Sequence, residues 1–156
     1  MENAIKMSFN KEELFNKCID LVNERINQYN EKLETISGED GEHNFHPDFD
    51  EYGNKGEMLT EYEKNATYLD RVRSMKETLA NLDLSHRSET VRPGSVVETK
   101  NNYYFVSVPL GEIDMDSGRQ VYAISTDAPI YKALEGKKAG DKFTFNDSEV
   151  EIVKVL

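Results

Sequence analysis

Residues 15–36 place an apolar side chain at every third or fourth position. The repeat is widened near its start by Leu14, Cys18 and Leu21, and its main members are Phe15, Ile19, Val22, Ile26, Tyr29, Leu33 and Ile36. A 3.5-residue spacing keeps one helix face turned toward a partner helix, as in a coiled coil. Asn10 with Glu13 three positions later is close to a capping box, and Ser37-Gly38 ends the pattern. The pattern predicts one long helix that pairs with another.

A second apolar pattern begins between Tyr52 and Gly56 and continues to about Leu82. Met58, Tyr62 and Leu69 accompany its main members, which are Tyr68, Val72, Met75, Leu79 and Leu82. Asn65 falls within this stripe, where a polar side chain more often fixes helix register than takes part in chemistry. Neither helix has enough apolar surface to be stable alone, so we predict an antiparallel hairpin roughly 40 Å long in which the helices cover each other.

The pattern changes to short β-branched and aromatic runs after Leu84. They predict one short helix at 129–135 and strands at 95–99, 102–109, 119–125, 142–146 and 149–156. Turns are expected at Asn101-Asn102 and Asp147-Ser148. The predicted fold class is α+β, with a coiled-coil hairpin over residues 1–84 and an antiparallel sheet domain with one helix over residues 85–156.

Composition and charge limit the classes of function. The net charge of −11 argues against direct binding to duplex DNA, which requires clustered Lys and Arg. No apolar run is long enough to span a membrane, and residues 1–14 lack the apolar stretch of a signal peptide, so we expect a cytoplasmic protein. We also expect it to be a monomer. The single cysteine, Cys18, lies in the helical apolar pattern and is expected to be a buried thiol.

Residues 128–141 carry a motif that bears on family. Their sequence, Ala-Pro-Ile-Tyr-Lys-Ala-Leu-Glu-Gly-Lys-Lys-Ala-Gly-Asp, resembles the Ser-Pro-x-x-x-Ala-Leu-x-Gly-Lys-x-x-Gly-Asp signature of the GreA/GreB C-terminal domain. Pro129 suits the first turn of a helix, and Gly136 and Gly140 permit tight turns. Ala128 replaces the usual Ser, which weakens the expected N-cap. A hairpin followed by such a domain is the Gre architecture, and the resemblance implies an FKBP-like fold for residues 85–156.

The resemblance also implies a function. Gre factors bind RNA polymerase, insert the hairpin into its secondary channel and stimulate cleavage of backtracked transcripts, so they meet the nascent RNA 3′ end only through the polymerase. Two acidic residues at the hairpin tip help to hold a Mg²⁺ ion jointly with the polymerase, and no metal is expected in the free protein. The chain would then not be an enzyme itself but a cofactor for the polymerase's own transcript hydrolysis.

The tip acids can be placed in two registers. The family's tip reads approximately His-Gly-Asp-Leu-x-Glu-Asn, and His46-Pro47-Asp48-Phe49-Asp50-Glu51-Tyr52 matches it with Asp48 and Glu51 as the pair and Asp50 as a third candidate. Carboxylate oxygens suit Mg²⁺. Counting back from the second helix instead gives Glu51 and Asn54, which loses one carboxylate.

Three other readings stay open. The chain could be a polymerase-binding regulator that does not stimulate cleavage. His43 and His46, three apart among carboxylates, could bind a transition metal, although no cysteine or third histidine nearby completes a set. A prolyl isomerase is a further candidate, but such enzymes commonly line their pocket with a Trp, and this chain has none.

Overall fold

The computed structural model describes residues 9–37 and 54–156. These fall into two compact units. The sheet unit consists of residues 9–18 and 78–156, and the hairpin unit consists of residues 19–37 and 54–77. The division at residues 84 and 85 that the sequence suggests stays a prediction, because compact units do not test which segments fold alone. In the part of the chain that the structure describes, no helix is long and apolar enough to cross a membrane.

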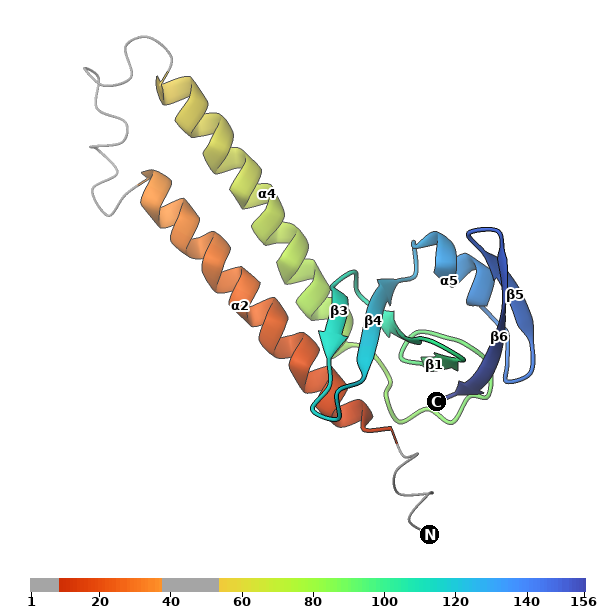
Figure 1. The fold of residues 1–156 in the computed structure, drawn as a ribbon. Coiled ribbons are helices and arrows are strands. Elements are labelled where there is room, and N and C mark those ends of the chain that lie inside the picture. Colours follow the sequence, from red (N-terminus) through yellow and green to blue (C-terminus); the bar gives the residue numbers. More distant parts are fainter. Residues whose placement is uncertain (1–8, 38–53) are drawn as a thin grey trace. The chain divides into compact units, whose positions relative to one another are not determined.

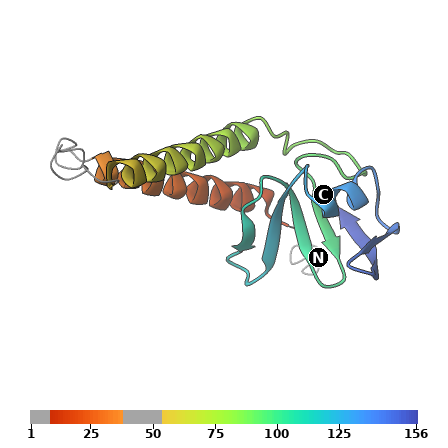
Figure 2. The same ribbon diagram turned by 90° about the horizontal axis from the view of Figure 1, so that it is seen from above.

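Two helices of 27 residues each, α2 (Lys11–Ser37) and α4 (Asn54–Ala80), form the hairpin that the apolar pattern predicts. Figures 1 and 2 show them side by side and running in opposite directions. The predicted cap at the start of α2 is confirmed, because the Asn10 side-chain oxygen accepts a hydrogen bond from the Glu13 N–H at 2.9 Å. This bond satisfies one of the N–H groups that the first turn of a helix leaves without a partner.

Burial along the helices is uneven. On α2, Leu14, Cys18 and Val22 are fully buried, whereas Ile26 and Leu33 are only half-buried. On α4 the buried side chains are Asn65, Leu69, Val72 and Leu79. A lone pair of helices covers only one narrow stripe on each, so apolar side chains that lie beside that stripe keep part of their surface in water. The expectation that Cys18 is a buried thiol is confirmed.

A six-stranded sheet has the strand order β3-β4-β2-β1-β6-β5. In chain order its strands are β1 (Val96–Thr99), β2 (Tyr103–Ser107), β3 (Gly111–Asp114), β4 (Gln120–Ser125), β5 (Lys142–Phe145) and β6 (Ser148–Val155). The sheet is antiparallel except for the pairing of β2 with β4, which is parallel. The fold class is therefore α+β with a mostly antiparallel sheet.

Strand β3 is a difference from the sequence prediction. Only one of its four residues, Ile113, is buried, so the alternating signal that marks a half-buried strand is too short to recognise. Because β3 lies between β2 and β4 in the chain and pairs antiparallel with β4, β4 runs in the same direction as β2. The parallel pairing of β2 with β4 therefore depends on β3, the strand that the sequence pattern does not predict.

The main core of the sheet unit lies between the sheet and helix α5 (Pro129–Leu134). Its buried members are Val91, Val97, Val106, Ile130, Tyr131, Leu134, Phe143 and Ile152. Figure 1 shows α5 beside β5 and β6. The turn between these two strands consists of Asn146 and Asp147, with φ of 51° and 62°. Asn and Asp adopt the left-handed region more readily than other residues with a side chain, so a two-residue hairpin forms here, one position earlier than predicted.

Candidate functional site

The predicted tip acids, Asp48, Asp50 and Glu51, lie outside the described residues, as do His43 and His46. Their roles therefore stay predictions. Phe45, Phe49 and Tyr52, the aromatic residues of the same stretch, also lie outside the described residues. Asn54, the second member of the alternative pair, is the first residue of α4.

Acidic charge is concentrated in the sequence that joins the two helices. Residues 38–53 contain six acidic residues and no lysine or arginine, so they contribute −6 of the net charge of −11. Residues 54–80 carry five acidic and five basic residues, and residues 11–37 carry six acidic and four basic. The helices are thus nearly balanced, and the joining sequence is where a cation would be attracted most strongly.

Within the hairpin unit, aromatic rings and basic side chains gather on both helices. The rings of Tyr29 on α2 and Tyr68 on α4 are 5.6 Å apart. Lys32 lies over the Tyr29 ring at 5.2 Å, and Arg71 lies over the Tyr68 ring at 5.7 Å. Cations at such distances are attracted to the ring faces. The tyrosine pair therefore joins the helices and holds basic groups beside them.

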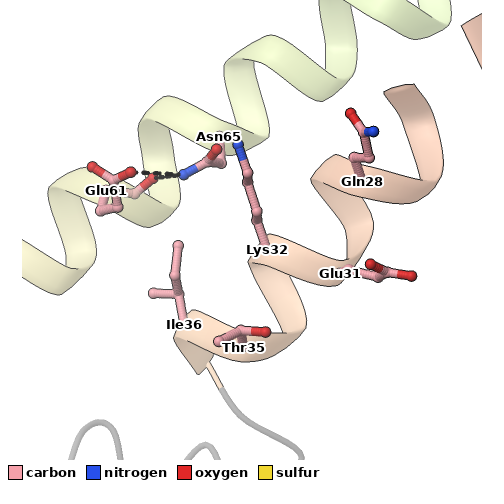
Figure 3. A pocket seen from close by; sticks show the side chains of 7 residues that line it. All are labelled: Gln28, Glu31, Lys32, Thr35, Ile36, Glu61 and Asn65. Carbon is pink, nitrogen blue, oxygen red and sulfur yellow. Dashed lines mark hydrogen bonds between the residues drawn. The ribbon is translucent and has the colours of Figure 1, made fainter. Parts of the chain in front are cut away.

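A pocket of about 490 Å³ lies between α2 and α4 in the same unit (Figure 3). Asn65, the polar residue in the apolar stripe of α4, lies at its wall and is only 4% exposed. Its amide nitrogen donates to the Glu61 carbonyl at 2.8 Å and to the Glu61 carboxylate at 3.2 Å. Lys32 extends from α2 toward Asn65. The remaining lining residues are Gln28, Glu31, Thr35 and Ile36.

The described part of the hairpin offers little reactive chemistry. Across residues 9–37 and 54–156, no group of three or more His, Cys, Asp or Glu side chains is placed to hold a metal ion. Burial raises the pKa of the Cys18 thiol to about 12, so it stays protonated at neutral pH and is a poor nucleophile.

The motif at residues 128–141 forms α5 and the turns after it. Pro129 occupies the first turn of α5, as predicted, and Leu134 is fully buried. Ala128 stands at the N-cap and provides no side-chain hydrogen bond, which is the weakness expected from the replacement of Ser. Gly136 and Gly140 have φ of +73° and +91°, the left-handed region that favours glycine. The motif is therefore explained by the packing and turns of the sheet unit.

Sequence reasoning missed a cluster of charged groups where the chain passes from α4 to β1. There Lys11, Asp83 and His86 lie close enough to one another and to Arg92 that neighbouring charges contribute to the shifted pKa of each of the three. Lys11 is more than seventy positions from the others in the sequence, so no local pattern could have indicated their proximity.

No family model matches the chain, and no curated protein is similar to it. Several chains of solved structures are similar to it, including the following two. The GreA factor homolog 1 (Gfh1) protein of Thermus thermophilus is 19% identical, with a TM-score of 0.34, and the match covers 88% of this chain and 94% of that one. A second structure, of the transcription factor Gfh1, is 18% identical with a TM-score of 0.33 and covers 92% and 91%. Both likenesses concern the fold, and with TM-scores below 0.5 they add no argument about function.

Proposed function

We propose that this chain is a transcription elongation factor of the Gre type. In this proposal it binds RNA polymerase, inserts its hairpin into the secondary channel and stimulates the polymerase's own cleavage of backtracked transcripts. The protein then has no active site of its own and supplies side chains to the site of the polymerase.

The observation that carries the proposal is the placement of charge on the hairpin. Helices α2 and α4 have 27 residues each, and at 1.5 Å per residue each is about 40 Å long. Six acidic residues and no basic residue lie in the sequence between them. A long, narrow element with acids between its helices suits a task in which carboxylates must reach a recessed cationic site.

Asp48 and Glu51 are the residues proposed to serve at that site. Carboxylate oxygens are the ligands that Mg²⁺ prefers, and one or two from this chain suffice when the polymerase provides the others. The ion, held jointly, would supply charge stabilisation for hydrolysis. The contribution of this chain would be to bring Asp48 and Glu51, with Asp50 between them, to the ion.

The test is an RNA cleavage assay on stalled, backtracked complexes of polymerase. Shortened RNA is expected only when polymerase, Mg²⁺ and this protein are all present. Asp48→Asn and Glu51→Gln should abolish the stimulation while binding to polymerase, measured separately by co-sedimentation, stays within about twofold.

A control removes twice the charge of either tip variant elsewhere in the acidic sequence. The double variant Glu39→Gln, Glu42→Gln loses two of its six acidic charges and should keep the stimulation. Loss of cleavage in this control would show that total charge matters rather than the Asp48–Glu51 pair. Normal cleavage by both tip variants would rule out the tip assignment.

The alternative is a regulator that binds the polymerase without stimulating cleavage. The observation that favours it is the second register of the tip, in which Asn54 at the start of α4 stands where a carboxylate is needed. Such a regulator would alter transcription initiation or pausing without producing shortened RNA. Absence of any binding to polymerase would exclude both functions.

A further inference from the structure

The connector, defined as residues 83–90, joins the end of α4 to the residues before β1. It forms no helix or strand, and apart from an isolated bridge between Thr90 and Lys138 it is held by its own short hydrogen bonds. The Asp83 carboxylate accepts bonds from the backbone N–H and the hydroxyl of Ser85, at 3.0 and 2.8 Å. The Ser88 hydroxyl donates to the Thr90 carbonyl at 3.0 Å. A segment held mainly by local hydrogen bonds can open without unfolding the rest of the unit.

The connector lies directly against the turn at Gly94. A Cβ atom placed on Gly94 would come within 2.6 Å of the Asp83 carbonyl oxygen and within 3.5 Å of Cδ2 of the His86 ring. The φ of Gly94 is +90°, so glycine is favoured both by the conformation and by the lack of space. The His86 ring and the Asp83 backbone are therefore the parts of the connector that rest on this turn.

The hydrogen bonds of His86 require a neutral ring. Its Nδ1 accepts a bond from the Ser88 N–H at 3.1 Å, which places the ring proton on Nε2. Nε2 is buried with no hydrogen bond of ordinary geometry, and the Gly94 carbonyl is the backbone acceptor that acts on the ring. A protonated ring would carry N–H groups at both nitrogens, so it could no longer accept the Ser88 bond.

The charged groups around His86 also oppose a positive ring. Lys11 comes from the start of α2 and Arg92 from the residues before β1, and both disfavour the charged form. Burial is the largest cause that lowers the pKa of His86 from its ordinary value of 6.5, and these two cations add to it. The Gly94 carbonyl and the Asp83 carboxylate raise the pKa of His86, but the net effect of all these groups still lowers it.

We propose that His86 is a proton-operated latch, whose neutral ring holds the connector on the Gly94 turn and whose protonation releases it. Taking up a proton breaks the Ser88 bond and places a third positive charge beside Lys11 and Arg92. The released state is the one in which the ring reaches water. This proposal goes beyond the proposed function and does not depend on it.

The test measures hydrogen exchange of the connector amides, Ser85 and Ser88 above all, from about pH 7.5 to about pH 5. Protection factors, corrected for the intrinsic pH dependence of exchange, should fall as the pH is lowered. The fall should not exceed about tenfold per pH unit, because one proton is involved. Amides of β1 and β2 should keep their protection and serve as an internal reference.

His86→Asn is the informative variant, because an Asn side-chain oxygen can accept the Ser88 bond but cannot be protonated in this range. It should keep the connector protected at every pH. His43→Asn with His46→Asn removes the other two histidines of the chain and should leave the pH dependence unchanged. A pH dependence that persists in His86→Asn, or one that disappears in the double variant, would overturn the latch.

A second measurement does not depend on whether the variant folds. An NMR titration of the wild-type His86 ring should give a pKa below 6.5, with the Ser88 amide shift following the same transition. A ring pKa at or above 6.5, or a Ser88 amide that does not respond to it, would contradict the proposal.

Discussion

The backbone N–H of Asp116 donates a hydrogen bond to the Glu13 carboxylate at 2.9 Å, between positions 103 apart in the sequence. The Asp116 carboxylate in turn lies 2.9 Å from the ammonium of Lys17, one turn along α2 from Glu13. Glu13 is the residue expected to complete the capping box of α2. Its carboxylate instead holds the turn between β3 and β4, and both contacts lie within the sheet unit.

Glu13→Ala should lower the free energy of unfolding by about 1–2 kcal/mol, because the variant removes a hydrogen bond between an N–H group and a charged acceptor. Urea unfolding measures the loss. Glu13→Gln keeps an acceptor oxygen and should cost less. Glu12→Ala removes the neighbouring, exposed acid of the same helix turn and should stay within about 0.5 kcal/mol of wild type. Equal losses in the Glu12 and Glu13 alanine variants would contradict the assignment.

Gly94→Ala should destabilise the sheet unit by more than about 2 kcal/mol, since the new Cβ meets the Asp83 carbonyl at 2.6 Å and φ is +90°. Gly140→Ala is the matched control. Its φ is +91°, but nothing lies within 4 Å of the added Cβ, so only the backbone conformation contributes, at about 1 kcal/mol. Denaturant midpoints compare the stability of the two variants. A larger loss of stability for Gly140→Ala would show that the structure around Gly94 accommodates the added Cβ at little cost.

Ala128→Ser should stabilise the protein by about 0.5–1 kcal/mol, because a hydroxyl at the N-cap of α5 can accept a backbone hydrogen bond that Ala128 cannot. Asn10→Ala removes the corresponding bond from α2 and should cost about 1 kcal/mol. Thermal unfolding followed by circular dichroism measures both. The same sign of change in the two variants would refute the capping argument.

Cys18 should resist thiol reagents in the native protein at about pH 8, because it is fully buried and its pKa is raised to about 12. Labelling should follow opening of the structure and accelerate with added urea. Cys18→Ser should cost about 1–3 kcal/mol, since it places a hydroxyl in an apolar site. Rapid labelling without denaturant would show that the site opens readily.

The helices could be predicted closely because their signals are local. A cap at Asn10, a repeating apolar stripe and the end at Ser37 all lie within α2 or beside it, and the observed bounds agree. Strand β3 and the parallel pairing of β2 with β4 could not be predicted, because one buried side chain marks β3 and the pairing depends on strands distant in the sequence.

The candidate site could also be predicted only in part. The acidic composition of residues 38–53 is visible in the sequence. Which two of these acids act together depends on their spatial register, and no local pattern chooses between Asp48–Glu51 and Glu51–Asn54. Lys11 and Arg92 both lie near His86, although they are far apart in the sequence. Composition and periodicity do not indicate such long-range proximity.

The link between Glu13 and Asp116 also constrains the order in which the chain can fold. During synthesis the first turns of α2 leave the ribosome long before the turn between β3 and β4 exists. Closing a loop of this length costs about 4 kcal/mol in chain entropy, which grows only slowly with length. Contacts between α2 and α4 can form while the sheet is still incomplete. We therefore expect the sheet unit, which contains both early and late residues, to become native last.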